Sequence, residues 1–317
     1  MTNEPLTHET PAVLVRGLRK TWPGGVEAVR GIDFEVAHGE VFGLLGPNGA
    51  GKSTTIGMLT TTVVPTAGLA HLTGFDVARD PIAARSVSGV VFQEAVVDAA
   101  LTGRRNLETH ARLWGVDAAV AERRAESLTR SFGLSELLDR PVATYSGGQR
   151  RRLEIIRGLL SSPKVLFLDE PTVGLDPRIR HELLDLIAGL RDTDDTTVVL
   201  TTHYLDEAER LCDRIGIMHE GRIVGLGTPS SLLASVGDEV LELRAPSEAG
   251  TAAAVRVLRG SGIDDAFVVG NTITIPIRNP ETVASISRLE LPTNATTTRP
   301  PNLDDVYLRL TGDRIAA

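Results

Sequence analysis

The segment 46–54 (GPNGAGKST) constrains the fold of this chain more than any other part of its sequence. It follows the apolar run 41–45, which is typical of a strand buried on both faces, and it precedes a stretch of helical character. This is the context of a phosphate-binding P-loop. Glycines let successive backbone N–H groups turn toward a phosphate, and the following helix presents the positive end of its dipole to the same anion. The segment therefore predicts an α/β fold that binds a nucleotide.

Lys52 and Ser53 are the residue types that phosphate chemistry at such a loop requires. The lysine ammonium reaches the β- and γ-phosphates, and the serine hydroxyl is a ligand of Mg²⁺. A glycine-rich turn with a chance Lys-Ser pair is the alternative, but the whole segment matches the pattern between a strand and a helix. We expect the nucleotide to be bound by Gly46, Asn48, Gly49, Ala50, Gly51, Lys52, Ser53 and Thr54.

Two adjacent acids follow a second apolar run in the segment 166–172 (LFLDEPT). A carboxylate at the end of a buried strand is costly unless a cation or a polar group meets it, so Asp169 fits a partner of Mg²⁺, through water. Glu170 fits the general base that polarises the attacking water. A solvent-facing strand end with two acids before a turn is the alternative, and the P-loop upstream argues against it.

The segment 145–149 (YSGGQ) begins a helical run shortly before the acid pair. Serine and two glycines at a helix start form a second anion-binding end, although Ser-Gly-Gly is common in plain loops. Together, GPNGAGKST, YSGGQ and LFLDEPTVGLD resemble the ATP-binding cassette (ABC) ATPases, in which YSGGQ is the signature loop. The resemblance implies hydrolysis of ATP with Mg²⁺, and it implies ATP contacts from Ser146, Gly147, Gly148 and Gln149.

The resemblance extends to four single residues. Gln93 matches the glutamine that contacts the metal and the attacking water, and His203 matches the switch histidine that reaches the γ-phosphate. Asp176 matches the aspartate at the dimer interface, and Trp22 occupies the position of the aromatic residue, usually tyrosine, that stacks on adenine. Each residue also has a structural alternative. Gln93 could be a polar residue at a strand end, and His203 a structural histidine. Asp176 could be a helix N-cap, and Trp22 a partly buried core aromatic.

Two more segments resemble one group of ABC proteins, the exporters of the daunorubicin/doxorubicin-resistance type. These are 98–107 (DAALTGRRNL), where Arg105 replaces a usual glutamate, and the tail 301–312 (PNLDDVYLRLTG). The catalytic resemblance covers residues 12 to about 227, and the middle of the C-terminal part carries the least specific match. The resemblance implies an ATPase subunit that powers export of a drug-like small molecule.

Two domains are expected. Residues 12–235 would form the ABC domain, with a mostly parallel sheet, an antiparallel β part and a helical subdomain at about 95–160. Residues 236–317 show runs in the order β-α-β-β-α-β before a last helix, which predicts a small α+β domain with a ferredoxin-like arrangement. The clearest elements are strands at 41–45, 165–168 and 196–202, a helical insertion at 107–132, and a hairpin at 215–224.

The charge balance argues against a nucleic-acid binder. The chain has 33 Lys and Arg against 41 Asp and Glu, a formal net charge of −8, whereas such a binder needs a basic stripe. A single cysteine, Cys212, excludes a disulfide framework, and we expect it to pack in the core. We expect residues 150–152 (RRR) to be a solvated or salt-bridged helix face.

The expected location is the cytoplasmic face of the membrane. No apolar run approaches the roughly 18–20 residues of a spanning helix, and residues 1–11 lack the apolar stretch of a secretory signal. A separate integral-membrane permease would therefore supply the path, docking on the helical insertion and the Gln93 loop. Each chain carries one P-loop and one signature loop, and in the ABC family these loops meet across a head-to-tail pair. The resemblance thus implies a homodimer with two composite ATP sites.

Three other hypotheses have a basis in the sequence. A soluble ABC ATPase acting on ribosomes or DNA usually carries two cassettes, a long coiled coil or a zinc insert, and none of these is present. A P-loop kinase or GTPase is disfavoured by YSGGQ, the acid pair and His203 together. A drug-binding or regulatory role of the C-terminal domain is compatible with the exporter hypothesis.

Overall fold

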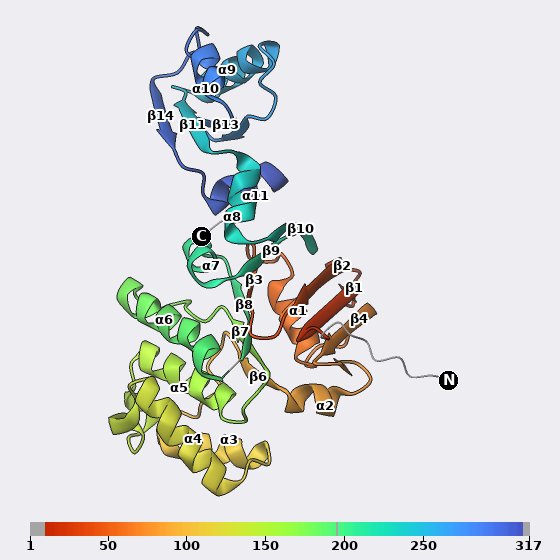
Figure 1. Ribbon diagram of the computed structural model, residues 1–317, viewed down its shortest axis with the longest axis vertical. Coiled ribbons are helices and arrows are strands. Elements are labelled where there is room, and N and C mark those ends of the chain that lie inside the picture. The colour runs from red at the N-terminus through yellow and green to blue at the C-terminus, as the bar shows by residue number, and fades with distance from the viewer. Residues whose placement is uncertain (1–9, 195, 313–317) are drawn as a thin grey trace. The chain divides into compact units, whose positions relative to one another are not determined.

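The computed structural model describes residues 10–194 and 196–312 (Figure 1). Our interpretation of residues 1–11 as lacking a signal rests mostly on residues outside this part. The chain divides into two compact units, one ending at Ile223 and the other beginning at Val224. The division lies before the expected boundary at 235/236, because helix α8 (Pro229–Val236) packs against α11 (Leu303–Thr311) in the second unit.

The first unit is built around a six-stranded sheet in the order β10-β9-β3-β8-β7-β6, and the division between the units falls within β10. Its strands from β9 to β6 pair in parallel. The β9–β10 connection is the pair Glu220 and Gly221, both at positive φ, which suits a tight hairpin. The strands are β3 (Val41–Leu45), β6 (Ser88–Val91), β7 (Val165–Asp169), β8 (Thr197–Thr202), β9 (Arg214–His219) and β10 (Arg222–Gly227).

The three central strands β3, β8 and β7 are buried along their whole length. Such strands read as unbroken apolar runs, which is why the predicted strands at 41–45, 165–168 and 196–202 are confirmed. Their register brings Leu45 opposite Thr202, and Asp169 opposite Thr201. The carboxyl ends of all three strands therefore meet at one edge of the sheet, where the P-loop begins.

A second, antiparallel sheet has the order β2-β1-β4-β5 and is the antiparallel part expected from the sequence. It shares one hydrophobic core with β3 and with α1 (Lys52–Leu59), and the rings of Phe34 and Phe42 stack at 5.1 Å within that core. The buried side chains of the P-loop helix α1 are thus held in this core. The strands are β1 (Val13–Thr21), β2 (Glu27–Val36), β4 (Ala67–Leu72) and β5 (Phe75–Asp76).

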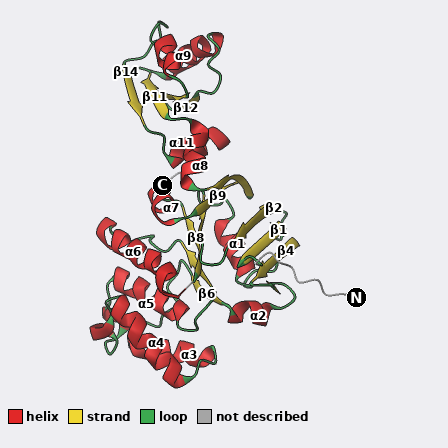
Figure 2. Ribbon diagram, viewed as in Figure 1, coloured by secondary structure: helices red, strands yellow, loops and turns green. Residues whose placement is uncertain are grey.

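Helices α3, α4 and α5 gather away from the antiparallel sheet (Figure 2). The helical insertion expected at 107–132 is two helices, because Gly115 takes φ 67 and Asp117 caps the second. Among the described residues, no helix combines the length and the apolar character needed to cross a membrane. The helices of this unit are α2 (Pro81–Ser86), α3 (Gly103–Leu113), α4 (Ala118–Ser131), α5 (Gly147–Leu159), α6 (Pro177–Asp194) and α7 (Leu205–Leu211).

The second unit confirms the expected order β-α-β-β-α-β. Its strands form one antiparallel sheet in the order β12-β13-β11-β14, with a separate apolar core that includes Leu241, Leu258 and Ile275. The elements are β11 (Glu239–Arg244), α9 (Glu248–Gly260), β12 (Phe267–Val269), β13 (Thr272–Ile277), α10 (Pro280–Ile286) and β14 (Ala295–Arg299).

Arg299 at the end of β14 explains the tail segment 301–312. Its guanidinium donates to both carboxylate oxygens of Asp305, at 2.7 and 2.9 Å, and to Glu242 of β11 at 2.8 Å. Asp305 is 2% exposed and also forms a capping box with Asn302 at the start of α11. One buried carboxylate therefore ties the last helix to the sheet.

Asp305→Asn is expected to loosen this tie, because the neutral amide keeps the shape but gives up a charged, two-pronged acceptor. Hydrogen bonds to charged groups contribute about 1.5–3 kcal/mol, so amide exchange in β11 and β14 should speed up by roughly 10- to 100-fold. Hydrogen exchange with mass spectrometry measures this. Glu290→Gln, which removes one charge at an exposed position, is the control; equal exchange in both variants would contradict the assignment.

Candidate active site

The P-loop connects the end of β3 to the first residue of α1. Close packing demands two of its glycines: a Cβ on Gly46 would lie 2.3 Å from the Met218 carbonyl oxygen, and one on Gly51 would lie 2.5 Å from that of Ala28. Gly51 also takes φ 105 directly before the helix. The loop is therefore pressed against the protein on one side, and the N-terminus of α1 is free to receive an anion on the other.

The side chain of Lys52 folds back over the loop. Its Nζ donates to the carbonyl oxygens of Gly46 at 2.7 Å and Pro47 at 3.1 Å, and it lies 3.5 Å from Glu170 Oε1. Only 4% of the side chain is exposed. Burial lowers the pKa of Lys52 below its usual value, although the carboxylates of Glu170 and Asp169 act in the opposite direction. A phosphate group would give this buried ammonium the anionic partner that favours its charged form.

Ser53 and Asp169 place two oxygen groups side by side. The Ser53 hydroxyl donates to Asp169 Oδ1 at 3.1 Å, and the Thr201 hydroxyl donates to the same oxygen at 2.5 Å. Hydroxyl and carboxylate oxygens are the ligands that Mg²⁺ takes beside phosphate oxygens and water. The pair fits that ion.

Glu170 has an unusual backbone conformation, with φ 44 in a residue that is not glycine. Left-handed backbone costs roughly 1–2 kcal/mol in such a residue, and it persists where the surroundings enforce it. In this conformation the carboxylate points toward two other polar side chains: Oε1 lies 3.5 Å from Lys52 Nζ and 3.4 Å from His203 Nδ1. A carboxylate so placed, and only 7% exposed, is suited to accept a proton from water.

His203 follows β8 and is 10% exposed. Its Nδ1 is buried and lies near Glu170 Oε1 without hydrogen-bond geometry, while its ring contacts that of Tyr204 at 4.2 Å between centroids. Lys52, Ser53, Asp169, Glu170 and His203 thus form one cluster. These are residues that the sequence had singled out from segments far apart in the chain.

The candidate residues outside the P-loop and the acid pair, apart from His203, make no hydrogen bond or ion pair to this cluster in the part of the chain that is described. Gln93 is exposed after β6, and Trp22 is 39% exposed, with Lys20 Nζ 4.6 Å from its ring centre. Ser146 and Gln149 form a capping box at the start of α5, and Asp176 accepts from the Ile179 N–H as the N-cap of α6. Asp176 is thus a helix N-cap, which was its structural alternative, and its carboxylate is nevertheless exposed.

Arg151 corrects our expectation for residues 150–152. Arg150 is exposed and Arg152 pairs with Glu182 at 2.6 Å, but Arg151 is only 9% exposed and donates to four backbone carbonyls. The helical spacing could have revealed it, because position 151 shares a face with the buried Ile155 and Gly158 of α5.

Glu207 of α7 is a second residue that sequence reasoning missed. Its buried carboxylate accepts from the hydroxyls of Thr172 at 2.5 Å and Thr202 at 2.8 Å, and it lies 3.6 Å from Arg180 Nε. Burial raises the pKa of Glu207, and the two hydroxyls oppose this shift. The side chain joins the segment after Glu170 to the end of β8, beside His203.

Comparisons with known proteins agree with this arrangement. A family model described as "ABC transporter" matches residues 29–173. The chain is 43% identical to the daunorubicin/doxorubicin resistance ATP-binding protein DrrA of Streptomyces peucetius, over 96% of this chain and 94% of that protein. It is 38% identical to the Nod factor export ATP-binding protein I of Ralstonia nicotianae, again over 96% and 94%.

A solved structure shares the fold of most of the chain. cbiO1 from Clostridium perfringens, part of the ABC transporter complex cbiONQ, superimposes with a TM-score of 0.66 at 28% identity, over 71% of this chain and 92% of that chain. Identity of 43% along nearly the whole length, together with the P-loop and acid-pair cluster, identifies the protein as a member of the ABC transporter ATP-binding proteins, an ATPase whose hydrolysis of ATP is coupled to transport.

Proposed function

We propose that this chain powers export of a drug-like small molecule through a separate membrane permease. The similarity to DrrA and to a Nod factor export protein supports an exporter, and it extends over the second unit as well as the catalytic one. The observation that carries the proposal is the Lys52–Glu170 cluster at the carboxyl ends of β3, β7 and β8, because it provides the parts that hydrolysis of ATP needs.

In the proposed mechanism, the P-loop amides and Lys52 bind the β- and γ-phosphates. Ser53 and Asp169 would hold Mg²⁺, which neutralises charge on the phosphate oxygens when bound. Glu170 accepts a proton from the water that attacks the γ-phosphorus, and the bond to the bridging oxygen of ADP breaks, releasing phosphate. His203 is assigned to the γ-phosphate and Gln93 to the water and the metal ion.

A second copy of the chain is the proposed partner at this site. Segment 146–149 and Asp176 make no hydrogen bond or ion pair to the cluster of their own chain among the described residues. Ser146 and Asp176 are exposed, so they are accessible to the nucleotide of another chain. A head-to-tail pair would give two composite sites, each closed by the γ-phosphate. Trp22, also exposed, is proposed to stack on adenine.

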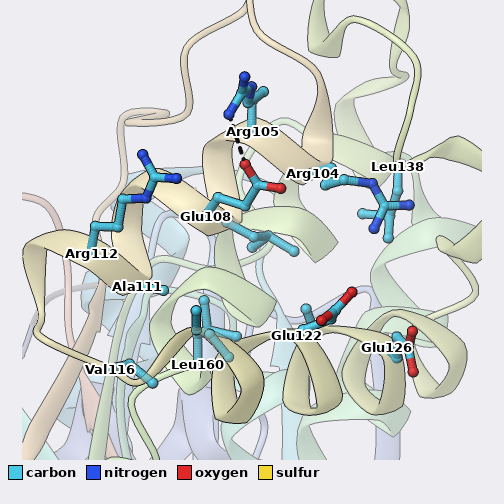
Figure 3. Close-up of a pocket in the computed structure, with 14 residues that line it drawn as sticks. Arg104, Arg105, Glu108, Ala111, Arg112, Val116, Glu122, Glu126, Leu138 and Leu160 are labelled. Carbon is cyan, nitrogen blue, oxygen red and sulfur yellow. Dashed lines mark hydrogen bonds and ion pairs between the residues drawn. The ribbon is translucent and has the colours of Figure 1, made fainter.

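The permease is proposed to dock in a groove between α3 and α4, shown in Figure 3. The groove encloses about 430 Å³, with an apolar floor that includes Leu107, Ala121 and Leu160. Charged side chains from both helices line it, and Arg105 pairs with Glu108 at 3.0 Å. An apolar floor with charges of both signs fits a short amphipathic segment of a membrane protein. The chain would then lie on the cytoplasmic face of the membrane.

A soluble ABC ATPase without a permease is the competing function. The net charge of −8 disfavours action on nucleic acid or ribosomes, whose phosphates repel such a surface. A regulatory or drug-binding role of the second unit could accompany export.

Export can be tested in a drug-sensitive bacterium that expresses the chain with each six-span membrane protein of its source genome. With the matching permease, the chain should sediment with membranes, and cellular daunorubicin fluorescence should fall several-fold. The Glu170→Gln chain with the same permease should leave accumulation at the level of cells that lack the transporter. Sedimentation with ribosomes, or unchanged accumulation with every permease, would favour the soluble ATPase.

A further inference from the structure

Helix α5 carries two long charged side chains on its buried face, Arg151 and Glu154, at positions i and i+3. Arg151 is 9% and Glu154 1% exposed. Buried charges of this kind are costly unless each finds specific partners. The hydrogen-bond partners of these side chains show which loops the helix α5 anchors.

Arg151 uses its guanidinium as a fork between two loops. Nε donates to the carbonyl oxygen of Pro171 at 2.7 Å, and one terminal nitrogen donates to those of Asp169 at 2.9 Å and Glu170 at 3.2 Å. The other terminal nitrogen donates to the carbonyl oxygen of Phe92 at 2.5 Å, directly before Gln93. A planar group with fixed donor directions can span these carbonyls, which a lysine ammonium cannot.

The backbone of Glu170 is therefore held on both sides of its left-handed conformation. Its N–H donates to the Thr201 hydroxyl at 3.0 Å, and its carbonyl accepts from Arg151. A strained residue keeps its geometry only where neighbours over-determine it. Arg151 and Thr201 supply that restraint, and the restraint directs the carboxylate toward Lys52 and His203.

Glu154 holds the Gln93 loop at a second point. Its Oε1 accepts from the backbone N–H groups of Val96 at 2.7 Å and Val97 at 2.9 Å. Gln93 thus lies between a carbonyl anchored by Arg151 and two amides anchored by Glu154. All these anchors belong to the helix whose N-cap is Ser146.

We infer that Arg151 is a positioning residue for hydrolysis, which fixes Glu170 and the root of the Gln93 loop to the signature helix. The inference rests on the proposed role of Glu170 as the general base. It also gives α5 a second role, because any shift of the segment 146–149 is passed through one side chain to the catalytic carboxylate of the same chain.

The test compares Arg151→Met, Arg151→Lys and, as matched control, Arg150→Met on the exposed neighbour. Misplacement of a catalytic group by about 1 Å costs on the order of 100-fold in rate, so kcat of Arg151→Met should fall about 100-fold. KM for Mg-ATP should stay within about threefold, because Lys52 and the loop amides are unchanged. Arg151→Lys should be intermediate, and it carries the test if the methionine variant does not fold.

A double-mutant cycle separates positioning from general stability. If Arg151 acts through Glu170, adding Arg151→Met to Glu170→Gln should slow single-turnover hydrolysis by less than about threefold. A further loss of about 100-fold in that background, or near-normal kcat in Arg151→Met and Arg151→Lys, would overturn the inference. Wild-type rates in Glu170→Gln would instead overturn the role of Glu170, so the two failures are distinct.

Discussion

Glu170→Gln is expected to slow hydrolysis by about 10²–10⁴-fold, the range for removal of a general base, and to leave ATP binding intact. Glutamine keeps the shape of the side chain but cannot accept the proton of the attacking water. Lys52, Ser53 and Asp169 keep their own contacts, since Lys52 also bonds two loop carbonyls. The loss of one negative charge beside the γ-phosphate should strengthen binding.

The uncleaved nucleotide should then hold two chains together. Size-exclusion chromatography of Glu170→Gln is expected to show a dimer with ATP and a monomer with ADP, and Glu136→Gln, at an exposed position, should behave as wild type. A monomer in both nucleotides, with near-normal hydrolysis, would refute both the base assignment and the head-to-tail pair.

Lys52→Ala is expected to remove ATP binding. Truncating one partner of a buried, hydrogen-bonded charge pair costs about 2–5 kcal/mol, which is at least about 30-fold in affinity. The same change leaves Glu170 without its nearest ammonium, so an anionic nucleotide would meet an unpaired carboxylate. Titration with a fluorescent ATP analogue measures the loss.

Lys164→Ala is the matched control, because it removes the same charge from an exposed position just before β7. It should bind ATP as wild type does. Equal affinity in the two variants would contradict the P-loop assignment.

The residues of the Lys52–Glu170 cluster could be picked out from the sequence because each of them lies in a contiguous pattern. Residues 46–54 form one loop, and the acids 169 and 170 end a strand whose apolar run is unbroken. The parallel pairing of β7 and β8 in the structure places Asp169 beside Thr201. Local sequence patterns therefore identified these residues, and the tertiary fold brings them together.

Arg151 and Glu207 escaped prediction because their meaning lies in contacts between distant segments. Arg151 looks like part of a basic run, and only the fold brings Phe92 and Pro171 to it. The division between Ile223 and Val224 was missed for the same reason, since the partner of α8 is α11, at the far end of the second unit. Helical spacing marked the buried position, but not its partners.

The sheet of the second unit has a consequence for synthesis on the ribosome. Its first strand, β11, takes its outer neighbour from the end of the unit, β14, and the Arg299–Asp305 contact closes that edge. Until residue 305 has left the ribosome, β11 presents an open row of backbone donors and acceptors to other nascent chains. A chain that terminates after β13 would never acquire β14, so this edge of β11 would stay exposed. We therefore expect such incomplete chains to be the ones that cellular quality control removes.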